Sequence, residues 1–154
     1  MREIPLPDTH ATERLGQALA PLLAAGDAVL LEGDLGAGKT TLARALLRTL
    51  CADPDMEVPS PSYTLVQVYD APVAEVAHFD LWRLDGPGGL HELGWDDACE
   101  GIVLVEWPER LGTLAPPDAL HVHLLHVAGG GRVARLAGWD TRLARLGNDG
   151  MGGS

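Results

Sequence analysis

Apolar residues recur along the chain at two different spacings, which separate predicted strands from predicted helices. Two short, continuous apolar runs, at 28–32 (AVLLE) and 102–106 (IVLVE), are typical of strands buried inside a parallel sheet. Leucines on one face predict a helix over 12–25, which Thr12 would cap and Pro21 would kink or shorten.

Weaker patterns extend this alternation of strands and helices. Two more helices are expected at 39–50 and, shorter, within 90–99, and four more strands are expected at 63–69, 73–80, 120–127 and 132–138. Strict apolar–polar alternation in the third of these strands indicates a half-exposed strand that pairs antiparallel with the fourth. The order predicts an α/β fold with three layers around a mostly parallel central sheet and antiparallel C-terminal strands. One domain is expected over 1–147, followed by a flexible glycine-rich tail at 148–154.

Charge and composition narrow the function. The 154-residue chain has 22 acidic and 11 basic side chains, a formal net charge of −11. Proteins that hold nucleic acid by themselves usually present a basic face, so autonomous RNA or DNA binding is disfavoured. The chain has neither an apolar span of the roughly 18 residues that a membrane helix needs nor a secretory signal, so we expect a cytoplasmic protein without membrane contact. Cys51 and Cys99 fit no zinc spacing or disulfide framework and are expected to be reduced, buried small hydrophobes.

The loop before the helix at 39–50 reads GDLGAGKT (33–40) and matches G-x-x-x-x-G-K-[ST] at every fixed position. Glycines let backbone N–H groups turn toward phosphate oxygens, and the helix N-terminus adds partial positive charge. Lys39, the only lysine of the chain, can reach the β- and γ-phosphates, and Thr40 can offer a hydroxyl to Mg²⁺. The motif predicts a P-loop NTPase-like fold with these nucleotide-binding residues: Gly33, Asp34, Leu35, Gly36, Ala37, Gly38, Lys39, Thr40 and Thr41.

A nucleotide–Mg²⁺ site also needs carboxylates, and two apolar strands end in one. Glu106 ends IVLVE and Asp80 ends VAHFD, so both are expected at the carboxyl edge of the sheet, where the loop also lies. Glu106 is the first candidate for the metal shell. Asp80 is either the alternative metal ligand or the group that orients the attacking water. The guanine-reading motif N/T-K-x-D needs a second lysine, so ATP is favoured over GTP.

Other residues give weaker signals. The proline-stiffened SPSYT loop (60–64) is either a switch-like segment that responds to the γ-phosphate or an ordinary turn. His78 is typical of a core or strand-face histidine. His121 and His123 alternate along one strand without an evident third ligand, which favours a solvated face over a metal site. Trp107 packs either beside the nucleotide site or in the core.

Motifs spread along nearly the whole chain resemble one family. In order they are IPLPDTHAT, GDLGAGKTTLAR, VPSPSYTLV, HFDLWRL, LGWDD and LVEWPER. The set is similar to the TsaE (YjeE) family, the small ATPases of bacterial tRNA threonylcarbamoyladenosine biosynthesis. Ser62 stands where this family usually has threonine, and Trp82 stands where it usually has tyrosine.

The resemblance implies a weak Mg²⁺-dependent ATPase that binds ADP well and works in an assembly with TsaB and TsaD. Those partners attach threonylcarbamoyl to adenosine 37 of tRNAs that read ANN codons, so tRNA would be met only through the complex. The residue roles that it implies are nucleotide and Mg²⁺ binding by Lys39 and Thr40, metal binding by Glu106, hydrolysis by Asp80, and placement near the nucleotide for Thr9 and Arg132.

A small-molecule or nucleotide kinase of P-loop fold is the alternative function. Such kinases usually carry an arginine-rich lid and an acceptor pocket, whereas Arg83 and Arg110 are isolated in this sequence. A nucleotide-gated scaffold that binds ADP or ATP and hardly hydrolyses it would differ from the ATPase only in rate. The sequence favours the accessory ATPase and leaves both alternatives open.

Overall fold

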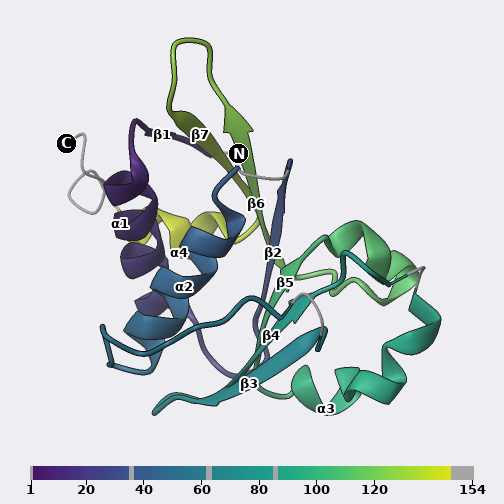
Figure 1. Cartoon of the computed structure of the whole chain (residues 1–154). Coiled ribbons are helices and arrows are strands. Elements are labelled where there is room, and N and C mark those ends of the chain that lie inside the picture. Colours follow the sequence, from purple (N-terminus) through teal and green to yellow (C-terminus); the bar gives the residue numbers. More distant parts are fainter. Residues whose placement is uncertain (1, 35–36, 62–63, 85–86, 147–154) are drawn as a thin grey trace.

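The computed structural model describes residues 2–34, 37–61, 64–84 and 87–146 (Figure 1). Its centre is a seven-stranded mixed sheet in the order β1-β7-β6-β2-β5-β4-β3. The strands are β1 (Arg2–Leu6), β2 (Ala28–Gly33), β3 (Val66–Asp70), β4 (Glu75–Asp80), β5 (Ile102–Glu106), β6 (Leu120–His126) and β7 (Arg132–Ala137). The α-helices are α1 (Thr9–Leu19), α2 (Lys39–Leu50) and the short α3 (Trp95–Ala98) and α4 (Asp140–Leu143).

Strands β6, β2, β5 and β4 run parallel, so their carboxyl ends share one edge of the sheet. The outer pairs are antiparallel: β3 with β4, β7 with β6, and β1 with β7. The register places Asp80, the last residue of β4, directly beside Glu106, the last residue of β5. The expected α/β fold, with a mostly parallel centre and antiparallel C-terminal strands, is confirmed.

Alternate residues of β2 face two hydrophobic cores, one on each side of the sheet. Val29 and Leu31 belong to a core shared with α1 and α2. Ala28 and Leu30 belong to a second core, shared with α3 and the 3-10 segment Pro108–Leu114. Figure 1 shows α1, α2 and α4 on one side of the sheet and α3 on the other, which gives the three layers.

Helix α2, which begins at the lysine of the loop motif, packs closely against α1. A Cβ on Gly16 of α1 would lie only 2.6 Å from the Cβ of Ala45 in α2, so a larger residue would push the two helices apart. Leu42 and Leu46 of α2 are fully buried in the core below them. This packing fixes the position of α2, and with it the positions of Lys39 and Thr40 in its first turn, relative to the sheet.

The first helix begins and ends earlier than the leucine pattern predicts. The cap is Asp8, whose Oδ1 accepts a hydrogen bond from the Ala11 N–H at 2.9 Å. The expected Thr12 cap was wrong, because Asp8 is already extended and capping one turn earlier, and Thr12 is buried inside the helix. Pro21 lies in the 3-10 turn Ala20–Leu22, where its missing N–H ends the regular α-helix.

Two strands differ from expectation in informative ways. Strand β1 was not predicted because Pro5 interrupts its pattern; it lies at the sheet edge and pairs only with β7, where proline is tolerated. Strand β6 was expected to be antiparallel, which is correct only toward β7, since β6 runs parallel to β2. The apolar–polar alternation in β6 reflects which side chains are exposed and not whether the neighbouring strands run parallel or antiparallel. The side chain of His121 is 46% exposed, and Val122 is buried.

Predicted boundaries in the middle of the chain also shift. The strands expected at 63–69 and 73–80 are observed as the shorter β3 and β4. The helix expected within 90–99 is interrupted, because it consists of the 3-10 turn His91–Leu93 followed by α3. Gly94 separates the two with φ 79°, a left-handed conformation that breaks the helical path.

The cysteines, the SPSYT loop and the predicted flexible tail complete this comparison. Cys51 and Cys99 are free but only half-buried, so the expectation of full burial was wrong. Cys51 directly follows the last turn of α2, where the chain leaves the core. Ser62 and the tail at 148–154 lie outside the described residues. Within the described ranges, no helix has the length and apolar character needed to cross a membrane.

Candidate nucleotide-binding site

The glycine-rich loop joins β2 to α2 at the carboxyl edge of the sheet. Gly33 has φ +145°, and a Cβ there would lie 2.7 Å from the Leu124 carbonyl oxygen of β6. Gly38 precedes α2 with φ 104°, a left-handed conformation that residues with side chains rarely adopt. The structure therefore requires glycine at both ends of the loop. Leu35 and Gly36, in the middle of the loop, lie outside the described residues.

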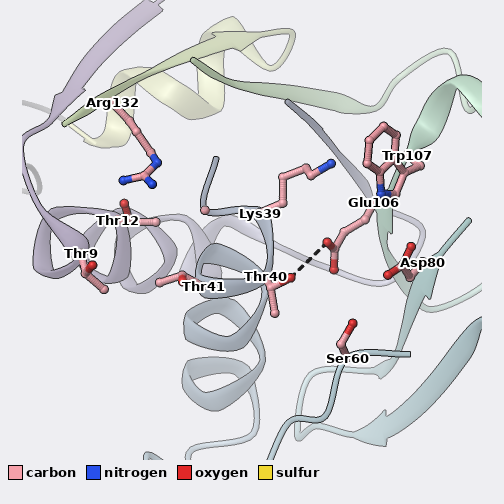
Figure 2. Close-up of a pocket in the computed structure, with 11 residues that line it drawn as sticks. Thr9, Thr12, Lys39, Thr40, Thr41, Ser60, Asp80, Glu106, Trp107 and Arg132 are labelled. Carbon is pink, nitrogen blue, oxygen red and sulfur yellow. Dashed lines mark hydrogen bonds between the residues drawn. The ribbon is translucent and has the colours of Figure 1, made fainter. Parts of the chain in front are cut away.

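A pocket of about 300 Å³ opens beside this loop (Figure 2). Its walls come from α1, the first turn of α2, the ends of β4 and β5, and the start of β7, and the lining residues are Thr9, Thr12, Gly38, Lys39, Thr40, Thr41, Ser60, Asp80, Glu106, Trp107 and Arg132. Figure 2 shows Thr9 and Arg132 toward one end and Asp80 and Glu106 toward the other, with the start of α2 between them. The pocket therefore has a carboxylate end and a hydroxyl–guanidinium end.

Lys39 places a nearly buried cation in this pocket, since only 5% of the residue is exposed. Its Nζ donates a hydrogen bond to the Gly33 carbonyl oxygen at 2.7 Å and lies 3.5 Å from the centroid of the Trp107 ring. Burial lowers the pKa of Lys39, and four carboxylates raise it in part: Glu106, Glu109, Asp80 and Asp34. A desolvated ammonium with uncharged direct partners is well suited to bind an anion.

Trp107 packs beside the site. Its backbone is left-handed, with φ 61°, a conformation that is uncommon for a bulky residue. The centroid of its ring lies 4.5 Å from that of Trp82, which is 44% exposed. The two indoles thus form a wall that begins at the surface and ends over the ammonium of Lys39.

Two buried carboxylates stand at the other end of the pocket. Glu106 is 3% and Asp80 is 5% exposed. The Thr40 hydroxyl donates to Glu106 Oε1 at 3.3 Å (Figure 2), and His78 Nε2 lies 2.7 Å from Glu106 Oε2. Asp80 Oδ1 accepts from the backbone N–H of Trp82 at 3.1 Å. A hydroxyl beside a carboxylate supplies the hard oxygen ligands that Mg²⁺ prefers.

The donor set is compatible with a metal ion that shares its ligands with a bound nucleotide. In the part of the chain that the structure describes, no three His, Cys, Asp or Glu side chains are placed to hold a metal ion among themselves. Mg²⁺ at nucleotide sites commonly takes one or two protein ligands and completes its shell with water and phosphate oxygens. His121 instead contacts Glu32 at 3.3 Å on an exposed surface, in agreement with the solvated face expected for it.

Most of the residues predicted for the site meet in this one pocket: Thr9, Gly38, Lys39, Thr40, Thr41, Asp80, Glu106 and Arg132. Gly33 takes part through its carbonyl group, which holds the Lys39 ammonium. Asp34 and Ala37 belong to the loop but do not line the pocket, and Ala37 is fully buried.

The sequence did not point to two further residues. Thr12 lines the pocket one helical turn after Thr9, and this spacing on one helix face would have found it. His78 faces the same side of β4 as Asp80, two residues later, and contacts Glu106 on the neighbouring strand. Ser60, the first residue of the SPSYT loop, also lines the pocket.

Comparison with known proteins identifies one family. The model of the family described as threonylcarbamoyl adenosine biosynthesis protein TsaE matches residues 6–134. The tRNA threonylcarbamoyladenosine biosynthesis protein TsaE of Nostoc sp. is 35% identical over 151 residues, which cover 95% of this chain and 91% of that protein. The protein of the same name from Rickettsia conorii is 39% identical over 114 residues, which cover 73% of this chain and 65% of that protein.

A solved structure has the same architecture. The crystal structure of Bacillus YdiB matches with a TM-score of 0.76 over 94% of this chain and 90% of YdiB. At 24% sequence identity this match shows a common fold. The family model spans most of the chain, and the Nostoc protein aligns along nearly its whole length. The chain belongs to the family of threonylcarbamoyl adenosine biosynthesis proteins TsaE.

Proposed function

We propose that this protein binds ATP and ADP with Mg²⁺ in the pocket, hydrolyses ATP slowly, and acts with TsaB and TsaD in tRNA modification. The observation that carries the proposal is the meeting of Lys39, Thr40 and Glu106 in one pocket, with 3.3 Å between Thr40 Oγ1 and Glu106 Oε1. A cation, a hydroxyl and a carboxylate are the groups that P-loop enzymes use to bind a nucleotide–Mg²⁺ complex.

The two ends of the pocket suit different parts of the nucleotide. Lys39 and the first turn of α2 would bind the β- and γ-phosphates, because they combine a desolvated cation with the positive end of a helix. Thr9 and Arg132 lie at the end away from the carboxylates and would contact the remainder of the nucleotide (Figure 2).

The two carboxylates would have separate roles in hydrolysis. Glu106 and Thr40 would hold Mg²⁺, which offsets the charge on the phosphate oxygens as the transferred group leaves. Asp80 would orient the attacking water from the end of the neighbouring strand. The hydrogen bond from the Trp82 N–H fixes the Asp80 carboxylate for this task. Lys39 would stabilise the negative charge that develops in the transition state.

The relatives supply the biological process. The Nostoc and Rickettsia proteins are named for tRNA threonylcarbamoyladenosine biosynthesis, and we place this protein in the same modification, at adenosine 37 of tRNAs that read ANN codons. A net charge of −11 opposes direct binding to the tRNA backbone. Contact with tRNA would therefore be indirect, through TsaB and TsaD.

The test is ATP hydrolysis by the purified protein, alone and then with TsaB, TsaD and tRNA from the same organism. We expect slow turnover alone that rises when the partners are added. If turnover does not change when the partners are added, the proposed ATP hydrolysis would stand, and the proposed action with TsaB and TsaD would be contradicted. Transfer of phosphate to a small-molecule acceptor in a parallel screen would favour a kinase instead.

A further inference from the structure

A histidine lies inside the core directly behind the pocket. His78 is in the interior of β4, is 0% exposed, and is paired in the sheet with Leu104 of β5. On the same strand and the same face, the equally buried Val76 of the hydrophobic core precedes His78, and the Asp80 carboxylate follows it, so His78 stands between the core and the pocket.

Packing alone does not explain a histidine at this position. Among the described residues, Nδ1 of His78 is buried without a hydrogen-bond partner, and an unpaired buried polar atom lowers stability. An apolar side chain would avoid that cost. The polar contact that His78 does make is short: Nε2 lies 2.7 Å from Glu106 Oε2.

This contact complements the one from Thr40. As a Mg²⁺ ligand Glu106 is ionised and can only accept hydrogen bonds, so the tautomer of His78 that pairs with it has its N–H at Nε2 and donates a hydrogen bond to Oε2. The Thr40 hydroxyl donates to the other oxygen, Oε1, at 3.3 Å. Two donors from opposite elements, β4 and α2, thus fix the rotation of the Glu106 carboxylate about its Cγ–Cδ bond.

We infer that His78 is a positioning residue: its buried hydrogen bond orients the Glu106 carboxylate so that Oε1, beside the Thr40 hydroxyl, is presented to Mg²⁺. This inference rests on the proposed Mg²⁺–nucleotide site. Hydrogen-bond partners of metal-binding carboxylates commonly alter metal affinity when they are replaced, because the free carboxylate rotates among several orientations.

The experiment measures equilibrium binding, without turnover. ADP affinity is determined by calorimetric titration at a series of Mg²⁺ concentrations for the wild type, His78→Leu and His78→Gln. Leucine fills the site without a donor, whereas glutamine retains an N–H donor. Val76→Ala is the matched structural control, because it weakens packing on the same face of β4 and leaves the Glu106 contact in place.

We expect H78L to raise the Mg²⁺ concentration that gives half of the full gain in ADP affinity by about tenfold or more. ADP affinity without Mg²⁺ should stay within about twofold of the wild type, since Lys39 and the loop are unchanged. H78Q should recover part of the Mg²⁺ response, and V76A should lower thermal stability with a wild-type Mg²⁺ response. If H78L does not fold, His78→Met, which also lacks a donor, takes its place.

The outcomes separate this inference from the proposed function. A wild-type Mg²⁺ response in H78L, or an equal shift in V76A, would overturn the role of His78 and leave the nucleotide site standing. A wild-type protein that binds no ADP, or whose ADP affinity does not change with Mg²⁺, would overturn the proposed site and the inference with it.

Discussion

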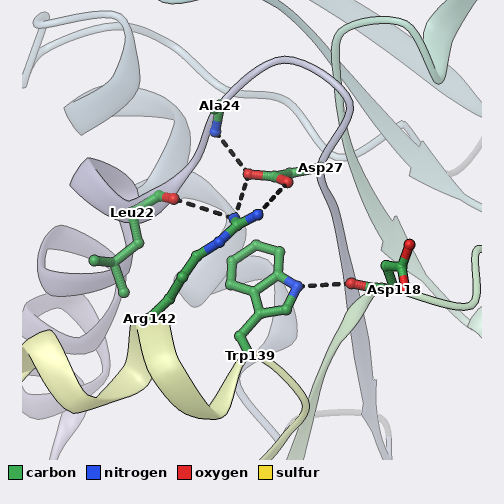
Figure 3. Close-up of polar contacts among 6 residues, drawn as sticks. All are labelled: Leu22, Ala24, Asp27, Asp118, Trp139 and Arg142. Carbon is green, nitrogen blue, oxygen red and sulfur yellow. Dashed lines mark hydrogen bonds and ion pairs between the residues drawn. The ribbon is translucent and has the colours of Figure 1, made fainter.

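Charged side chains gather at both ends of the parallel strands, and the two groups are built differently. At the amino ends, Arg142 of α4 donates to both carboxylate oxygens of Asp27, at 2.6 and 3.0 Å, and to the Leu22 carbonyl at 3.3 Å (Figure 3). The guanidinium lies 4.3 Å from the centroid of the Trp139 ring, whose indole N–H donates to the Asp118 carbonyl at 2.7 Å. In this Arg142 clamp, opposite charges satisfy each other.

In the pocket at the carboxyl ends, two charged side chains, Lys39 and Glu106, have contacts with uncharged groups. The Lys39 ammonium is held by the Gly33 carbonyl and the Trp107 ring, and one oxygen of Glu106 is held by the Thr40 hydroxyl. In a matched ion pair such as the clamp, each charge is already neutralised by its partner, so a ligand would interact with it only weakly. A charge that is held by dipoles still gains interaction energy when a ligand of opposite charge binds. This difference indicates that the clamp is suited to stabilise the fold and the pocket is suited to bind a charged ligand.

The largest effect should follow from removing the cation of the pocket. Lys39→Ala should weaken ADP and ATP binding by about 100-fold or more, because a desolvated charge contributes several kcal/mol to binding a charged ligand. The thermal stability of the variant should equal or exceed that of the wild type, since the variant no longer buries an ammonium. Calorimetric titration with ADP and a thermal melt measure the two quantities. If the folded variant binds ADP with wild-type affinity, the phosphates do not bind in this pocket.

A smaller effect is expected from Glu106→Ala. Mg²⁺-dependent turnover should fall by about 10- to 100-fold or more, because the metal loses its carboxylate ligand, while ADP affinity without Mg²⁺ changes far less. Asp80→Ala is the matched comparison: it should lose turnover and keep the Mg²⁺ response of ADP binding. The opposite pattern, with the Mg²⁺ response lost in D80A and retained in E106A, would assign the metal to Asp80.

The clamp should show the reverse profile. Arg142→Ala should lower the free energy of unfolding by about 1–2 kcal/mol, less than a fully buried charged pair would, because solvent screens the partly exposed guanidinium. The Arg142 side chain is 37% exposed and that of Asp27 is 11% exposed. ADP affinity should be unchanged. Urea unfolding measures the free energy of unfolding, and ADP titration measures the affinity. Arg142→Lys, which keeps the charge and loses the bidentate geometry, should recover only part of the stability.

A change in ADP affinity in R142A would contradict the separation of the two regions. It would mean that the amino ends of the strands help to set the conformation of the pocket. A double-mutant cycle with Asp27→Asn then tests whether the Asp27–Arg142 pair itself carries that coupling.

The sequence predicts the pocket better than the clamp, for a physical reason. The loop from Gly33 to Thr40 is contiguous, so its spacing alone carries the geometry. Glu106 and Asp80 are found because an acid that ends an apolar strand must lie at the carboxyl edge. Arg142 and Asp27 are 115 residues apart, and no local pattern indicates that α4 returns to the start of β2.

The same limit explains other features that the sequence did not predict, beginning with a contact behind the pocket. The contact of His78 with Glu106 depends on β4 lying next to β5, which only the strand order reveals. Strand β1 was not predicted because Pro5 interrupts the strand pattern, although proline is tolerated in an edge strand. The pattern of β6 gave its exposure correctly and its direction only in part, because side-chain alternation follows solvent and not the direction of the neighbouring strand.

The smallest expected effect tests the pocket without ligand. Burial lowers the pKa of Lys39 in the folded protein, so between that pKa and the usual value of about 10.4 the unfolded chain binds more protons than the folded chain. The destabilisation by Lys39 is therefore fully present below this window and disappears as the pH rises through it.

Urea unfolding of the wild type and of Lys39→Met, from about pH 8 to about pH 10.5, isolates this contribution, because other titrating groups are common to both proteins. The wild type should gain stability relative to K39M as the pH rises. A difference that stays constant would mean that the ammonium is not desolvated. The large loss of ADP affinity expected for Lys39→Ala would then lack its physical cause, since the desolvation that lowers stability is the one that strengthens phosphate binding.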